Sequence, residues 1–275
     1  MLMRFGCCLN MLSKRPDGTG AEHLDTLKAA GYDYVELPLA EMCAMPDRDI
    51  QSLREKLELM GLSCEACNNF FPKTLRLTGS NADPACAAEY TARALELAAS
   101  LGAKRVVFGS GPAKNVPNGF PIEKGYEQVV RLLQTAAPIA AEKEITIAIE
   151  PLRRAECNLI NTFAEGCRLA ADVSHRNVKV LVDYYHFTVE QEPLNNLREF
   201  GAKWLTHVHF AEPDGRVYPT ADAAGRYLAF FRTLKEIGYD GRVSIEAYSG
   251  DYRAQAKMSL QLMRAVAACA ATNRE

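Results

Sequence analysis

The segment TIAIEPLRRAE, residues 146–156, joins an apolar run directly to a carboxylate, Glu150, and Pro151 follows at once. The run at 146–149 is typical of a buried strand, and proline ends the hydrogen bonding of such a strand because it has no backbone N–H. A charge at the end of a core strand is costly unless that end meets a polar site or a cation. The segment therefore predicts a strand whose carboxyl end is the start of a functional site.

Seven further runs rich in strand-forming residues recur along the chain. Most are continuously apolar, which is typical of strands that are covered on both faces. Ala- and Leu-rich segments with helical spacing lie between them. With the run at 146–149 included, the eight strand runs lie near residues 3, 32, 62, 104, 145, 178, 204 and 242. The helical segments cover residues 20–30, 47–60, 84–101, 121–143, 162–174, 223–237 and 253–271.

This alternation predicts an α/β fold, a (β/α)₈ barrel formed as a single domain by residues 1–275. A doubly wound open sheet is the alternative, but no GxGxxG motif follows the first strand. We expect Asp47 and Asp83 to cap the N-termini of their helices.

The composition excludes several classes of protein. With 24% charged residues and a net charge of -2, the chain has no basic excess that would indicate nucleic-acid binding. No apolar run reaches the roughly 18 residues of a membrane span, and the N-terminus is too short and polar for a signal peptide. Nine cysteines without a secretion signal indicate reduced thiols and a cytoplasmic protein.

Four consecutive predicted strands in the second half of the chain end on a carboxylate or an imidazole. Active sites of such barrels lie at these strand ends, where three buried carboxylates would repel one another or take up protons. A divalent cation removes this cost. Three oxygen ligands and one nitrogen ligand suit manganese, magnesium, cobalt, iron or zinc, without a choice among them. The four residues are Glu150, Asp183, His209 and Glu246.

Other polar residues on the predicted strands are expected outside the ligand set. His207 precedes His209 by two residues, so both face the same way on a strand, and we expect His207 in a lower layer of the barrel rather than among the ligands. Glu36 and Asn68 end earlier strands and are expected to line the pocket, whereas Glu65 is not.

Four segments together resemble one known family, the sugar phosphate isomerases/epimerases of the xylose isomerase-like TIM barrels. The closest pattern is that of the D-tagatose/D-psicose 3-epimerases. The resemblance is strongest between residues 145 and 248 and only general before them. The segments are IEPLRRAE (149–156), LVDYYHF (181–187), HVHFAEPDGR (207–216) and LKEIGYDGRVSIEA (234–247).

This resemblance implies that the four strand-end residues ligate one divalent ion, usually manganese, and that Glu150 and Glu246 also act as acid and base on opposite faces of a ketose. One carboxylate would remove a proton next to the carbonyl, a metal-stabilised cis-enediolate would form, and the other carboxylate would return the proton. A homo-oligomer, either dimer or tetramer, is also implied. The implied substrate contacts are Glu156, His186 and Arg216, the last one residue farther along than the family pattern.

The chain departs from that pattern where the pocket wall is expected. Ala247 and Tyr248 follow the last glutamate in place of proline and an aromatic residue, and Arg153 replaces a smaller polar residue. The arginines 153, 154 and 216 suggest the hypothesis of a phosphate or carboxylate on the substrate.

Three other functions are alternatives to an epimerase. A metal-dependent lyase, such as a dehydratase of an inosose-like or dehydroshikimate-like substrate, begins with the same proton abstraction, so the sequence does not exclude it. An endonuclease IV-like repair enzyme would need more histidines than the five present and a basic surface. A non-catalytic sugar- or metal-binding protein is disfavoured by the complete ligand set.

Overall fold

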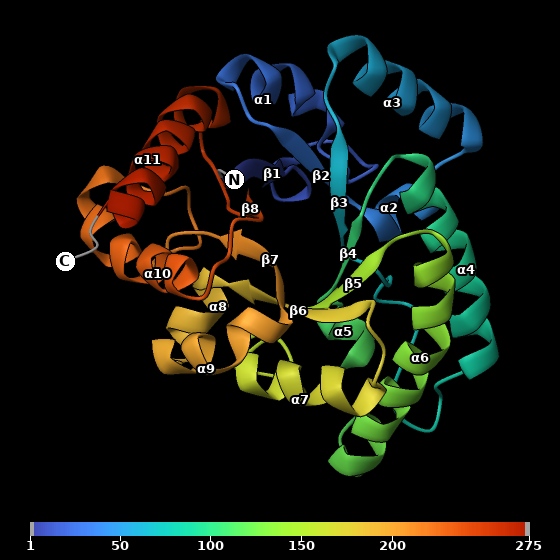
Figure 1. Ribbon diagram of the computed structural model, residues 1–275. Coiled ribbons are helices and arrows are strands. Elements are labelled where there is room, and N and C mark those ends of the chain that lie inside the picture. Colours follow the sequence, from blue (N-terminus) through green and yellow to red (C-terminus); the bar gives the residue numbers. More distant parts are fainter. Residues whose placement is uncertain (1–2, 273–275) are drawn as a thin grey trace.

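The computed structural model describes residues 3–272, and within them eight parallel strands form a closed barrel in chain order (Figure 1). β1 pairs with both β2 and β8, and this pairing closes the sheet. The predicted (β/α)₈ fold is confirmed, and each predicted run contains a strand. The strands are Arg4–Cys8 (β1), Tyr34–Pro38 (β2), Cys64–Asn68 (β3), Arg105–Phe108 (β4), Thr146–Ile149 (β5), Val178–Asp183 (β6), Leu205–Phe210 (β7) and Arg242–Ile245 (β8).

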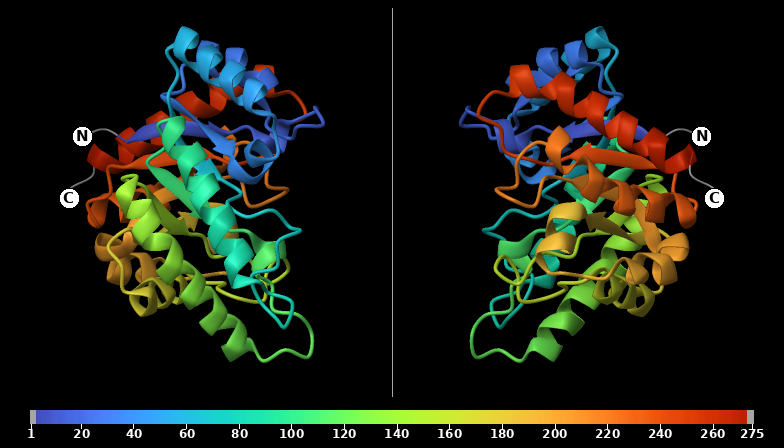
Figure 2. Two further views of the ribbon diagram at one scale, coloured as in Figure 1. Left: turned by 90° about the vertical axis from the view of Figure 1, so that its right-hand side faces the viewer. Right: turned by 90° about the vertical axis from the view of Figure 1, so that its left-hand side faces the viewer.

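Helices surround the barrel and cover the outer faces of its strands (Figure 1). Every predicted helical segment contains a helix, whereas α9 and the short helices α2, α5 and α8 were not predicted. Figure 2 shows that the loop before α6 and the first part of α6 project away from the barrel. The helices are Leu24–Ala30 (α1), Leu39–Cys43 (α2), Asp47–Met60 (α3), Pro84–Ser100 (α4), Gly111–Lys114 (α5), Ile122–Glu142 (α6), Phe163–Val173 (α7), Tyr184–Val189 (α8), Leu194–Trp204 (α9), Ala224–Glu236 (α10) and Tyr252–Thr272 (α11).

Among residues 3–272, no helix has both the length and the apolar character that a bilayer-spanning segment requires.

The two predicted helix caps have different outcomes. The side chain of Asp83 accepts hydrogen bonds from the backbone N–H groups of Ala85 and Cys86 at 2.9 and 3.0 Å, so this prediction is confirmed. The prediction for Asp47 is wrong. Pro46 occupies the N-cap position of α3 in an extended conformation, and Asp47 is already the first helical residue.

The layer of the barrel beneath the strand ends has an apolar half and a polar half. Strand side chains alternate between the barrel interior and the helices, so the residue two positions before each strand-end residue lies one layer lower. Val107, Ala148 and Leu181 form a small cluster separate from the main core. In the polar half, Ser244 Oγ lies 2.8 Å from the Tyr34 hydroxyl and 3.4 Å from His207 Nε2. The polar half therefore comes from β2, β7 and β8.

Gly6 in the middle of β1 and Glu65 near the start of β3 explain two further features of the barrel. A Cβ atom on Gly6 would lie 2.2 Å from the Tyr34 ring, so only glycine leaves room for that ring. Glu65 forms ion pairs with Arg4 and Arg242 at the strand starts. It is thus at the opposite end from the carboxyl ends of the strands, as predicted.

Candidate active site

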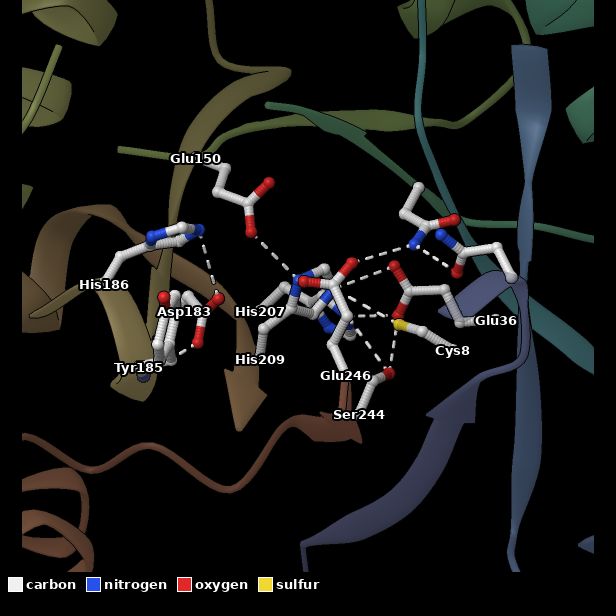
Figure 3. A network of polar contacts seen from close by, with 12 residues as sticks. Cys8, Glu36, Glu150, Asp183, Tyr185, His186, His207, His209, Ser244 and Glu246 are labelled. Atoms are coloured by element: carbon white, nitrogen blue, oxygen red, sulfur yellow. Dashed lines mark hydrogen bonds and ion pairs between the residues drawn. The ribbon is translucent and has the colours of Figure 1, made fainter. Parts of the chain in front are cut away.

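The four strand-end residues come together at the carboxyl end of the barrel (Figure 3). Glu150 and Glu246 directly follow β5 and β8, Asp183 ends β6, and His209 is the penultimate residue of β7. One potential ligand atom from each lies within 4.8 Å of those from the other three. A donor set predicted from four separate segments is therefore compact enough for one ion.

Short contacts orient the members of this set. His209 Nδ1 lies 3.0 Å from Glu150 Oε1 and 3.4 Å from Glu246 Oε2. A Cβ atom on Gly109 would lie 2.2 Å from Glu150 Oε2, so glycine at the end of β4 makes space for this carboxylate. Gly109 was not among the predicted site residues; its signal in the sequence is a glycine placed directly after an apolar strand run.

Asp183 and Glu246 are each held by a second group. The Tyr185 backbone N–H donates to Asp183 Oδ1 at 2.9 Å, which leaves Oδ2 free to face Arg216 Nη2 at 3.4 Å. Asn68 Nδ2 donates to Glu246 Oε1 at 3.0 Å, and Arg216 Nη2 lies 2.5 Å from Glu246 Oε2. Asn68 was expected to line the pocket, but it is buried, does not line the cavity described below, and instead holds a candidate ligand.

The electrostatics of this cluster favour a bound cation. Burial raises the pKa of Asp183 to about 7; Arg216 opposes this rise, and the carboxylates of Glu246 and Glu150 add to it. Burial also raises the pKa of Glu150. The pKa of Glu246 would rise through burial as well, but the charges of His209 and Arg216 lower it instead. A divalent ion would allow all three carboxylates to be charged together, and the donor set of three carboxylates and one imidazole fits such an ion.

Arg216 reaches the cluster from a strained turn. Its φ of 51° is in the left-handed region, where a residue other than glycine is uncommon. The Tyr248 N–H donates to the Arg216 carbonyl at 2.8 Å, and the guanidinium lies 4.8 Å from the centre of the Tyr185 ring. These contacts hold the conformation that brings Arg216 close to both Asp183 and Glu246. Local strain of this kind is common at functional sites.

His186 and Glu156 lie beside Arg216. The backbone N–H of Arg153 donates to His186 Nδ1 at 3.3 Å, so Nε2 carries the hydrogen of the neutral ring. Burial, followed by the charge of Arg216, lowers the pKa of His186 to about 3, which keeps the ring neutral. Within the described part of the chain, its buried Nε2 has no hydrogen-bond partner. Glu156 lies with one oxygen 3.8 Å from Arg216 Nη1.

A cavity of about 1400 Å³ lies over this cluster. Glu150 and Glu246 line the cavity, whereas Asp183 and His209 do not. All three predicted substrate contacts also line it, and further lining residues from the loops include Asn10, Asn69, Phe71, Ser110 and Tyr248. Two of the four candidate ligands are thus open to a bound molecule, and both are carboxylates.

The structure corrects two expectations about nearby residues. Glu36 does not line the cavity, because it is fully buried and contacts His207 and His209. Neither Arg153 nor Arg154 lines the cavity either.

Both arginines have carboxylate partners of their own. Arg153 Nε lies 2.7 Å from Glu156 Oε1, and Arg154 pairs with Glu190, the residue directly after α8. The hypothesis that they select an anionic substrate therefore has no support, since these partners neutralise their charge.

Comparisons with known proteins agree with this architecture. The L-ribulose 3-epimerase of Methylomonas sp. is 26% identical over 81% of this chain and 76% of its own length. The ketose 3-epimerase of Arthrobacter globiformis is 25% identical over 90% of this chain and 84% of its own length. A crystal structure of D-psicose 3-epimerase in the presence of D-fructose has a TM-score of 0.78 at 21% identity, covering 98% of this chain and 97% of that chain.

These relatives are sugar epimerases, which supports an enzyme that acts on carbohydrates. The family model of the xylose isomerase-like TIM barrels matches residues 24–266. The chain therefore belongs to the xylose isomerase-like TIM barrel family.

Proposed function

We propose that this protein is a divalent-metal-dependent epimerase of a ketose-type sugar, with Mn²⁺ as its ion. The observation that carries this proposal is the compact set of Glu150, Asp183, His209 and Glu246, of which only the two glutamates line the cavity. The sugar epimerases among the relatives support the same reaction class.

The division between lining and buried residues suggests separate roles. When bound, the ion supplies Lewis-acid stabilisation of the negative charge that develops on substrate oxygens. Glu150 and Glu246 directly follow β5 and β8 and both line the cavity, so one could remove the proton next to the carbonyl of a bound sugar while the other returns it on the opposite face. This sequence inverts the carbon. Asp183 and His209, beneath them, would hold the ion only.

The remaining lining residues would orient the sugar. His186 Nε2–H is a donor without a partner in the described chain, and it points to the same region as the Arg216 guanidinium. Glu156 is an acceptor at the same side of the cavity. A donor, a cation and an acceptor can together fix several hydroxyl groups, which is how binding positions the reacting carbon.

Isotope exchange tests the proposed chemistry. We expect that incubation of a panel of ketoses with the protein and Mn²⁺ in D₂O will place deuterium on the carbon next to the carbonyl, as read by NMR. An epimer of unchanged mass apart from deuterium supports an epimerase, whereas loss of water would indicate a lyase. Absence of exchange with every sugar, together with absence of bound metal by X-ray fluorescence, would contradict the proposal.

The role of Glu150 has its own test. Glu150→Gln removes the group that accepts the proton, so we expect the exchange rate to fall by about 100-fold or more. Glu127→Gln is the matched control, because Glu127 is an exposed residue of α6 whose side chain is 61% accessible. Metal content of both variants is measured in parallel. An unchanged exchange rate in Glu150→Gln would show that this assignment is wrong.

A further inference from the structure

Glu36 occupies an unusual position for a carboxylate. It lies on β2, is fully buried, and does not reach the cavity. Three donors surround it (Figure 3). His209 Nε2 lies 2.9 Å from Oε1, while His207 Nε2 and Ser244 Oγ lie 2.8 and 2.5 Å from Oε2. Both carboxylate oxygens therefore accept hydrogen bonds from groups of the protein itself.

These contacts determine which nitrogen of His209 faces the candidate metal site. A carboxylate only accepts hydrogen bonds, so His209 must carry a hydrogen on Nε2 where it meets Glu36. The opposite nitrogen, Nδ1, points to Glu150 Oε1 and Glu246 Oε2 at 3.0 and 3.4 Å. In the neutral ring with Nε2–H, Nδ1 has a free lone pair, which is what a metal ligand requires.

His207 fixes Glu36 from the other side. Its Nε2 meets the carboxylate, and its Nδ1 is buried without a hydrogen-bond partner among residues 3–272. A hydrogen on that Nδ1 would be a buried unsatisfied donor, so His207 is neutral and donates through Nε2. His207 thereby holds the carboxylate against His209.

A second cation between these three residues is a competing possibility. Glu36, His207 and His209 do have potential ligand atoms within 4.8 Å of one another. Both Nε2 atoms, however, already lie at hydrogen-bond distance from Glu36, and Ser244 donates to the same carboxylate. Hydrogen bonds therefore already occupy the two histidine Nε2 atoms and both oxygens of Glu36, which a cation between these residues would need as ligands.

We propose that Glu36 is a positioning residue that holds His209 as the Nε2–H tautomer, so that Nδ1 is available to the divalent ion. This inference rests on the metal site of the proposed function and extends it to a residue that touches neither ion nor substrate. Carboxylates that accept a hydrogen bond from a metal-ligating histidine commonly change metal affinity about 10–100-fold when they are replaced.

Glu36→Gln tests the proposal with little change of shape. Glutamine offers one acceptor oxygen and one NH₂ group, so it cannot accept from all three donors. The NH₂ group is best placed against His209, because the hydrogen displaced to Nδ1 then finds an acceptor in Glu150, whereas His207 Nδ1 has none. A hydrogen on His209 Nδ1 blocks the metal. We expect Mn²⁺ affinity, measured by calorimetric titration of the chelator-treated full chain, to fall about 10–100-fold.

Ser244→Ala is the matched control. It removes a donor to the same carboxylate but leaves the contact between Glu36 and His209. We expect this variant to bind Mn²⁺ like the wild-type protein. Equal Mn²⁺ affinity in Glu36→Gln and wild-type protein would overturn the proposal. An equal loss in Ser244→Ala and Glu36→Gln would also overturn it, since the effect would then belong to the whole network.

A measurement on the wild-type protein keeps the proposal testable if Glu36→Gln does not fold. In ¹⁵N-histidine-labelled protein with diamagnetic Zn²⁺ bound, we expect His209 to show a hydrogen-bearing Nε2 and a metal-bound Nδ1. A hydrogen-bearing Nδ1 would overturn the proposal. Failure of the wild-type protein to bind Mn²⁺ or Zn²⁺ is a different result, because it would contradict the metal site of the proposed function itself.

Discussion

At the scale of single residues, Gly109 shows how closely the candidate site is packed. The backbone at this position is not in the left-handed region, so alanine is conformationally acceptable there. Its Cβ atom would nevertheless lie 2.2 Å from Glu150 Oε2. The position of the carboxylate that follows β5 therefore depends on the absence of a side chain directly after the neighbouring strand β4.

Gly109→Ala should consequently displace Glu150. A misplacement of about 1 Å at a reacting group can cost about 100-fold in rate, and we expect a loss of that order in sugar epimerisation, with a free energy of unfolding lowered by about 1–3 kcal/mol. Gly225→Ala on α10 is the control, since no atom lies within 4 Å of its added Cβ. A Gly109→Ala variant as active as the control would contradict this account of Glu150.

The sequence predicted the four candidate ligands because each ends an apolar run, a local signal. It did not predict the groups that hold them. Asn68 and Glu246 are 178 residues apart, and Glu36 and His209 are 173 apart. Such pairs meet only across the barrel, so no local pattern indicates them. The ion pairs of Arg153 and Arg154 were not predicted either, because the sequence does not show which carboxylate a given arginine contacts.

At the scale of elements, α3 and α4 differ in how they begin. Both begin where an aspartate lies next to a proline in the sequence. In α4, Asp83 precedes the proline and its side chain accepts two backbone N–H groups. In α3, the proline comes first and takes the N-cap position, which has no side-chain hydrogen bond. The order of the two residues decides which aspartate is a cap.

Substitution of these two aspartates should separate capping from the general effect of charge. We expect Asp83→Ala to lower the free energy of unfolding by about 1 kcal/mol, because two N–H groups lose their acceptor. Asp47→Ala should lose only the interaction with the helix dipole, about 0.3–0.5 kcal/mol. Urea denaturation measures both. A larger loss for Asp47→Ala would contradict the assigned caps.

The elements themselves were largely predictable, with an instructive exception in α9. Its sequence contains two asparagines and Gly201, all poor helix formers. Packing accounts for the helix, because Leu197 is fully buried and a Cβ on Gly201 would lie 2.5 Å from Ile237 Cδ1. The glycine that weakens the local signal is therefore the residue that lets α9 approach α10.

At the scale of the whole molecule, the charge of the cavity bears on its substrate. Away from the candidate ligands and Glu156, and apart from Arg216, five acidic and three basic side chains line it, a difference of two negative charges. Lys56 is paired with Asp25 at 3.0 Å, which leaves Arg15 and Lys73 as the other cations. The acidic residues are Asp17, Glu22, Asp25, Glu41 and Asp49.

This balance favours a neutral sugar over a phosphorylated one. We expect kcat/KM for a free ketose to exceed that for its phosphate, because a dianion would meet a net negative surface. The two are compared at equal, low ionic strength, where screening is weakest. Equal or faster turnover of the phosphate would contradict this prediction.

The candidate ligands around His209 and several of the groups that align them come from different halves of the chain. All four candidate ligands lie on or directly after β5–β8, whereas Glu36, Asn68 and Gly109 lie on or directly after β2–β4. The second half of the chain therefore supplies the ligands, and the first half supplies several of the groups that align them. An ion that binds only the aligned set favours the state in which both halves are joined through the β1–β8 and β4–β5 pairings. Metal binding would thus stabilise both the β1–β8 and the β4–β5 pairing, although the ion contacts residues of only one half of the chain.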